Sequence, residues 1–110
     1  MEGRKDDLGK LRWDLIPPEA LEEIVRVYTM GASKYEPWNW LKGMAWSRVF
    51  AAIMRHLWAW ARGERTDSES GLSHLAHAAW GCFTLMEFER LGRGTDDRYN
   101  NQVVMTKETS

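Results

Sequence analysis

The chain has 110 residues, which is the size of one domain and leaves no room for two. Hydrophobic residues make up 44% and charged residues 28%, a globular composition that excludes wholesale disorder. The 15 Lys and Arg residues nearly balance the 16 Asp and Glu residues, so the charge indicates neither a nucleic-acid polymer nor a membrane as partner. One cysteine excludes an internal disulfide framework, and no signal peptide or membrane span is visible, so we expect a cytoplasmic protein.

The first predicted helix follows an extended segment over residues 1–15. Prolines at positions 17 and 18 suit the start of a helix, because proline there loses only a backbone donor that has no partner. The helix ends at Gly31 or one turn later. Its apolar stripe recurs with helical spacing and consists of Leu21, Ile24, Val25 and Tyr28.

Two further helices are predicted on either side of a polar loop. The second runs from an N-cap at Ser47 to about Arg62, and the third from an N-cap at Ser70 or Ser68 to about Leu91. The core stripe of the second helix is Val49, Phe50, Ile53, Leu57 and Trp60. The main stripe of the third is Leu72, Leu75, Ala76, Ala79, Phe83 and Met86.

The third helix is apolar on nearly all sides, because Trp80, Cys82, Leu85 and Phe88 cover much of the rest of its surface. Two neighbouring helices cannot cover such a surface, so we expect a homodimer or homotetramer. Cys82 is expected to be buried and inert. The predicted fold is a small all-α bundle of three to four helices over residues 1–92, followed by a polar tail over residues 93–110 that is flexible or packed on a neighbouring subunit.

Three histidines and an acidic loop are the strongest candidates for chemistry. His56 points inward from the second helix, whereas His74 and His77 share a face of the third helix outside its main stripe. The loop between these helices carries Glu64, Asp67 and Glu69. Imidazoles with carboxylates suit a divalent transition metal. Alternatively, the three carboxylates hold Mg²⁺ while His56 and Arg55 contact phosphate.

Two other patterns have both a structural and a functional interpretation. The loop over residues 36–46 contains three of the seven tryptophans, which either pin the loop to the core or present flat surfaces to a ligand. Arg48, Arg55 and Arg62 recur every seven residues along one line of the second helix. That line is either a solvated face or a row of cations for phosphate.

Several blocks of sequence resemble the N-terminal domain of the phage dATP/dGTP diphosphohydrolase family. They are residues 9–21, 31–35 with Asn39 and Trp40, 55–57 and 63–78, and the resemblance spans about residues 5–91. This family is associated with all-α, MazG-like nucleotide pyrophosphohydrolases. The resemblance implies hydrolysis of dGTP or dATP to the monophosphate and pyrophosphate, with Mg²⁺ or Mn²⁺, in phage nucleotide metabolism in the host cytoplasm.

The resemblance also implies roles for individual residues. Metal ligands would be Glu64, Asp67, Glu69, His74 and His77, and the first three with His56 would form the catalytic set. Lys34 and Arg55 would meet phosphate, Trp38 and Trp40 would stack on the purine, and Asn39 would read its edge. Tyr35 completes the substrate-binding set.

The chain departs from the wider MazG-like pattern at the carboxylates. Those enzymes carry Glu-x-x-Glu on one helix and Glu-x-x-Asp on the next. Here Glu19 and Glu22 provide the first pair, but His74 and His77 stand where the second is expected. Two functions are therefore open: a hydrolase with a metal site rebuilt from the loop, or a nucleotide-binding protein that sequesters a host immune signal without hydrolysis. A third possibility is an oligomeric partner protein whose aromatic residues form an interface.

Overall fold

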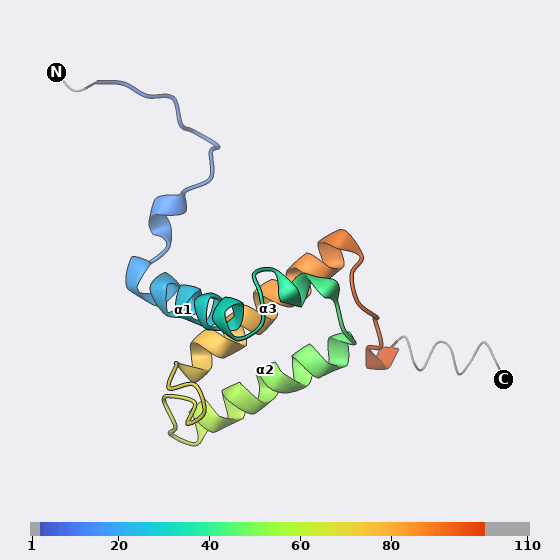
Figure 1. Cartoon of the computed structure of the whole chain (residues 1–110). Helices are drawn as coiled ribbons and strands as arrows, with labels where there is room; N and C mark the ends of the chain where they lie inside the picture. Colours follow the sequence, from blue (N-terminus) through green and yellow to red (C-terminus); the bar gives the residue numbers. More distant parts are fainter. Residues whose placement is uncertain (1–2, 101–110) are drawn as a thin grey trace.

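The computed structural model describes residues 3–100, and this part of the chain is all-α, as predicted. It contains three α-helices, α1 (Pro18–Lys34), α2 (Trp46–Ala61) and α3 (His74–Leu91), and no named strand within residues 3–100. Two short 3₁₀ turns, η1 (Trp13–Leu15) and η2 (Asn39–Lys42), precede α1 and α2. α3 is the central helix, because it packs on both α1 and α2 (Figure 1).

The helix starts show which side chains act as caps. α1 begins after Pro17 as predicted and continues through Gly31 to Lys34. The Ser47 cap predicted for α2 is wrong: the helix begins at Trp46, after Ala45. Ser47 instead donates from its backbone N and from Oγ to the Asp97 carboxylate, at 2.9 and 2.6 Å.

The start of α3 also differs from the prediction. Ser73, and not Ser70 or Ser68, caps this helix, because its Oγ accepts from the backbone N of Ala76 at 3.1 Å. Leu72 therefore precedes the helix and is not part of its apolar stripe. The reason is local: backbone hydrogen bonds within the loop, described below, keep residues 66–73 out of the helix.

The α2–α3 contact uses small side chains. Val49 and Ile53 of α2 pack with Ala78 and Phe88 of α3 in the core, and Gly81 lies directly against Ile53. The main stripes predicted for these helices are wrong in part. The reason is that α2 packs on the small residues of α3, so several large residues of the predicted stripes remain exposed. The larger side chains left exposed are Phe50 (57%), Trp60 (50%), Leu75 (43%), Phe83 (39%) and Met86 (55%).

A third side of α3 faces neither α1 nor α2. Leu75, Cys82 and Met86 follow one another at spacings of seven and four residues, so they share this side, and all three are exposed. The prediction that Cys82 is buried is wrong, because two neighbouring helices cover only two sides of α3. The face formed by Leu75, Ala79, Cys82 and Met86 is called the outer α3 face below.

The beginning of the predicted tail packs against the start of α2. Trp46 donates from its backbone N to the carbonyl of Thr95 and from Nε1 to the carbonyl of Arg93, both at 2.9 Å. A Cβ on Gly43 would lie 2.7 Å from the backbone N of Gly94, so this chain crossing requires glycine. Residues 101–110, the remainder of that predicted tail, lie outside the described residues.

The N-terminal segment from residue 3 to η1 is exposed and leads away from the three helices (Figure 1). The extended segment predicted over residues 1–15 is wrong at its end, because Trp13–Leu15 form the 3₁₀ turn η1. Leu8 is 94% exposed and Trp13 is 75% exposed. Within residues 3–100, no helix has both the length and the apolar character needed to cross a membrane.

Candidate functional site

The loop between α2 and α3 folds back on itself beside the first turn of α3. Thr66 and Ser73 form an isolated antiparallel bridge, and the backbone N of Asp67 donates to the carbonyl of Leu72 at 2.8 Å. The backbone N of His74 donates to the carbonyl of Arg65 at 3.0 Å. These bonds hold the middle of the loop over the histidines of α3.

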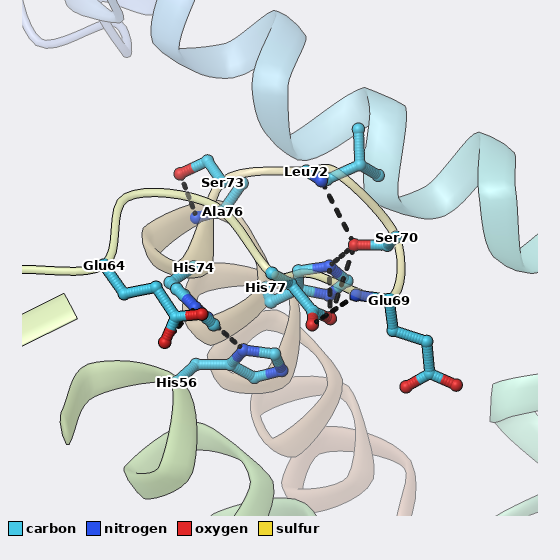
Figure 2. Close-up of polar contacts among 10 residues, drawn as sticks. His56, Glu64, Glu69, Ser70, Leu72, Ser73, His74, Ala76 and His77 are labelled. Carbon is cyan, nitrogen blue, oxygen red and sulfur yellow. Dashed lines mark hydrogen bonds and ion pairs between the residues drawn. The ribbon is translucent and has the colours of Figure 1, made fainter. Parts of the chain in front are cut away.

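All three histidines meet at this point (Figure 2). His56 Nδ1, from α2, lies 2.9 Å from His74 Nδ1, on α3. The rings of His56 and His77 are stacked, with centroids 4.5 Å apart and planes 5° apart. The expectation that His74 and His77 lie away from the core stripe is wrong for His74, which is 5% exposed. It is buried because α2 packs over this face of α3.

The surroundings of His56 and His77 disfavour the charged form of each imidazole. A hydrogen bond between two Nδ1 atoms needs one N–H and one lone pair, so His56 and His74 cannot both carry a proton there. Burial lowers the pKa of His56, and the neighbouring His77 and His74 lower it further. Burial also lowers the pKa of His77, although Asp67 opposes that shift. A neutral imidazole can accept a proton from water.

The structure separates the three carboxylates of the acidic loop. Asp67 Oδ2 lies 3.7 Å from His77 Nε2, and Glu64 Oε2 lies 3.6 Å from His74 Nε2. The Glu69 carboxylate points away from the imidazoles, and only its backbone N contributes, donating to Asp67 Oδ1 at 3.1 Å (Figure 2). Burial alone would raise the pKa of Asp67, but this N–H and the imidazoles lower it overall.

Ser70 joins the histidines to the loop. Its Oγ is hydrogen-bonded to His77 Nε2 at 2.8 Å, accepts from the backbone N of Leu72 at 3.2 Å and lies 3.4 Å from Asp67 Oδ2 (Figure 2). The sequence suggested only a helix cap here. The contact depends on the loop folding back over α3, and spacing along the chain gives no signal of that.

One imidazole and one carboxylate of the cluster are placed to hold a metal ion. His74 Nε2 is buried, has no hydrogen-bond partner and faces Glu64. An imidazole and a carboxylate together suit Mn²⁺ or Zn²⁺ better than Mg²⁺. In the part of the chain from residue 3 to residue 100, no three His, Cys, Asp or Glu side chains form a group that could hold a metal ion. The residues therefore fit a cation as a pair of ligands, and the larger predicted ligand set stays a prediction.

A cleft of about 1060 Å³ opens beside the histidines, between the C-terminal half of α1, the loop around η2, and α3. Its walls are largely aromatic: the ring centroid of Tyr28 lies 6.0 Å from that of Trp40 and 6.2 Å from that of Trp80. Trp40 is partly buried, whereas Trp38 is 68% exposed. One tryptophan thus anchors the loop and the other remains open to a ligand. His77 also lines the cleft and connects it to the histidine cluster.

The cleft brings together five of the six residues predicted to bind substrate, namely Lys34, Tyr35, Trp38, Asn39 and Trp40. Arg55 is exposed on α2 and is not part of the lining, and Arg48 and Arg62 are exposed as well. Sequence reasoning assigned three aromatic lining residues only to the apolar surfaces of the helices, namely Tyr28, Trp80 and Phe83, and gave no role to Glu87.

Residues 1–98 match the model of a protein family described as dATP/dGTP diphosphohydrolase, N-terminal. The chain belongs to this family. It is also 37% identical over 98 residues to the dATP/dGTP diphosphohydrolase of Salmonella phage PMBT28. That alignment covers 89% of the chain but 33% of the relative, so the chain spans about a third of the length of the relative. No solved structure matches the chain. The resemblance predicted from the sequence blocks is confirmed.

Proposed function

We propose that the chain binds a purine deoxynucleoside triphosphate in the aromatic cleft and hydrolyses it to the monophosphate and pyrophosphate. The observation that carries this proposal is the continuity of the cleft with a partly buried imidazole–serine–carboxylate cluster through His77. The name of the phage relative, which has 37% identity to this chain, supports the choice of substrate.

The aromatic end of the cleft suits the base. Exposed Trp38 and partly buried Trp40 have ring centroids 6.1 Å apart, and Asn39 lies between them in sequence on the same wall. Stacking on such rings contributes roughly 1–3 kcal/mol per base. Lys34, at the end of α1, is the cation of the lining and would meet the phosphates.

The histidine end of the cleft suits the attacking water. His77 is the imidazole that lines the cleft, and its Nε2 is oriented by Ser70, which is hydrogen-bonded to it at 2.8 Å. In the proposed reaction, the water oxygen bonds to the α-phosphorus, the bond to the bridging oxygen breaks, and pyrophosphate leaves. The His77 imidazole takes up the proton of the water, and Asp67 stabilises the resulting positive charge.

A divalent cation is part of the proposal, with His74 Nε2 and the Glu64 carboxylate as its ligands from the chain. Water would complete its coordination. Such a cation would supply charge stabilisation at the phosphate oxygens.

Purified protein incubated with dGTP or dATP and Mn²⁺ or Mg²⁺ tests this function. We expect dGMP or dAMP and pyrophosphate as products. We expect Asp67→Asn to lower kcat by about 10²-fold or more, because His77 loses the carboxylate that stabilises its protonated form. Glu69→Gln should have a much smaller effect, because that carboxylate points away from the imidazoles. Tight binding with dGTP recovered intact would reject hydrolysis and favour the sequestering function. Equal losses in the two variants would reject the assigned roles.

We also propose that two copies pair through the outer α3 face. This face is apolar over three turns, and its centre carries the small side chains of Ala79 and Cys82, which let two helices approach closely. Size-exclusion chromatography with light scattering should show a dimer. Met86→Glu should yield monomers, whereas Leu8→Glu, on the exposed N-terminal segment, should not. A monomeric unmodified chain at micromolar concentration would reject the pairing.

A further inference from the structure

The segment over residues 11–16 exposes large apolar side chains next to the start of α1. It follows a turn in which the backbone N of Lys10 donates to the carbonyl of Asp7 at 3.0 Å, and Gly9 in this turn has a φ of 84°. Contiguous apolar surface of this kind is typical of a site that contacts another protein. Its exposed side chains are Leu11 (79%), Trp13 (75%), Leu15 (68%) and Ile16 (45%). The segment, called the N-terminal arm below, therefore calls for a protein surface that covers it.

α2 presents a second exposed apolar surface. Phe50, Met54 and Trp58 follow one another at spacings of four residues, so they share one side of the helix. Phe50 is 57% exposed and Trp58 is 60% exposed. Val49 and Ile53, which pack on α3, lie on another side of α2. The surface formed by Phe50, Met54 and Trp58, called the outer α2 face below, thus remains largely open within residues 3–100.

Arginines border the outer α2 face. Arg55 and Arg62 flank Trp58 at spacings of three and four residues, along α2 and the residue that follows it. Both are exposed, as is Arg48, and residues 46–62 contain no Asp or Glu. These cations therefore have no partner of opposite charge on their own helix. The face suits an apolar segment with carboxylates beside it.

Carboxylates follow the N-terminal arm along the chain. Within the arm, Arg12 is already paired with Asp14 at 2.7 Å. Residues 18–25, the first two turns of α1, contain glutamates and no Lys or Arg. Two of these glutamates, Glu19 and Glu23, are four residues apart, so they lie on one side of α1. The arm and the start of α1 together are apolar and acidic, which complements the outer α2 face and its arginines.

The arm lies away from the outer α2 face of its own chain. α1 and α2 both pack on α3, and the arm leaves the start of α1 in the direction away from α2 (Figure 1). We infer that the N-terminal arm of one copy docks on the outer α2 face of a second copy, with Glu19 and Glu23 beside the arginines. The inference rests on the pairing of two copies proposed above, and in a symmetric pair the contact forms twice.

Trypsin cleavage of the full chain, followed by mass spectrometry, tests the docking, because a docked arm must separate before the bond after Arg12 can be cut. The unmodified protein, at a concentration at which light scattering shows a dimer, should be cut there about tenfold more slowly than Trp58→Glu. Trp60→Glu, the same change at a tryptophan on another side of α2, should stay protected. Met86→Glu, which separates the copies, should be cut as fast as Trp58→Glu. Cleavage after Lys5, before the turn, should be equal in all four proteins.

Circular dichroism of each variant establishes that it is folded, and Arg62→Glu is a second variant of the same surface that should speed cleavage after Arg12. An unmodified dimer that is cut as fast as Trp58→Glu would overturn the docking and leave the pairing intact. Equal acceleration in Trp58→Glu and Trp60→Glu would reject the outer α2 face as the docking surface. Slow cleavage in monomeric Met86→Glu would also overturn the inference, because the arm would then be covered by its own chain.

The oligomeric state separates this inference from the pairing on which it rests. A monomeric unmodified protein would reject the pairing and the docking together, whereas a dimer with an unprotected arm rejects only the docking. Turnover of dGTP, measured in parallel, tests hydrolysis separately from both.

Discussion

Two glycine-to-alanine substitutions, one at Gly81 in α3 and a control at Gly31 in α1, test how α2 and α3 pack. Gly81 is buried on α3, where an added Cβ would overlap Cγ1 of Ile53 and lie 3.0 Å from its Cδ1. Gly31, within α1, has no atom within 4 Å of the position of an added Cβ. The two substitutions therefore change helix propensity equally and differ only in steric overlap.

The expected effects have opposite signs. Alanine is favoured over glycine inside a helix by about 1 kcal/mol, so Gly31→Ala should raise the free energy of unfolding by roughly 0.5–1 kcal/mol. At Gly81 the same gain is opposed by overpacking, which costs about 1–3 kcal/mol because the middle of the Ile53 side chain must move. Gly81→Ala should therefore be neutral or destabilising by up to about 2 kcal/mol. For a domain of this size, 1 kcal/mol shifts Tm by about 4–8 °C.

Urea unfolding followed by circular dichroism, at one protein concentration, measures both values. Ile53→Ala alone should cost about 2–5 kcal/mol, but less in the Gly81→Ala background, because the new methyl group fills part of the cavity. Stabilisation of Gly81→Ala equal to that of Gly31→Ala would refute the packing described here. A separation of α2 from α3 would also move His56 away from His74, so turnover should fall in Gly81→Ala.

Two further predictions concern pH. The pKa values of His56 and His77 are lowered in the folded protein, so below about pH 6.5 the unfolded chain binds protons more readily. The free energy of unfolding, measured with chelator, should therefore be constant above about pH 7 and fall below it. His56→Gln should weaken this pH dependence, and an unchanged profile would contradict the assignment. The hydrogen bonds from Ser47 lower the pKa of Asp97. The stabilising contribution of Asp97 should therefore be present above about pH 4 and be lost as the pH falls through the folded pKa. Asp97→Asn should destabilise the protein at neutral pH but not at acidic pH.

Local signals in the sequence were sufficient for the number and order of the α-helices. Proline at the start of α1 and glycine after α3 act within one turn of the chain, so three helices in this order could be predicted. The predictions that Ser47 and Ser70 are helix caps were wrong. Ser47 hydrogen-bonds to Asp97, which is distant in sequence, and Ser70 hydrogen-bonds to His77 from a folded-back loop. A cap signal cannot be distinguished from a tertiary contact by composition alone.

The sequence by itself determined the inventory of the candidate site: three imidazoles, a carboxylate loop and a tryptophan-rich segment, each on its element. Only the tertiary structure decided how they are used. Because α2 packs over Gly81, the small face of α3 is buried and His74 with it, while the opening between α1 and α3 becomes a cleft. The relative rotation of packed helices depends on side-chain shape across the contact. Helical spacing along one chain segment does not contain that information.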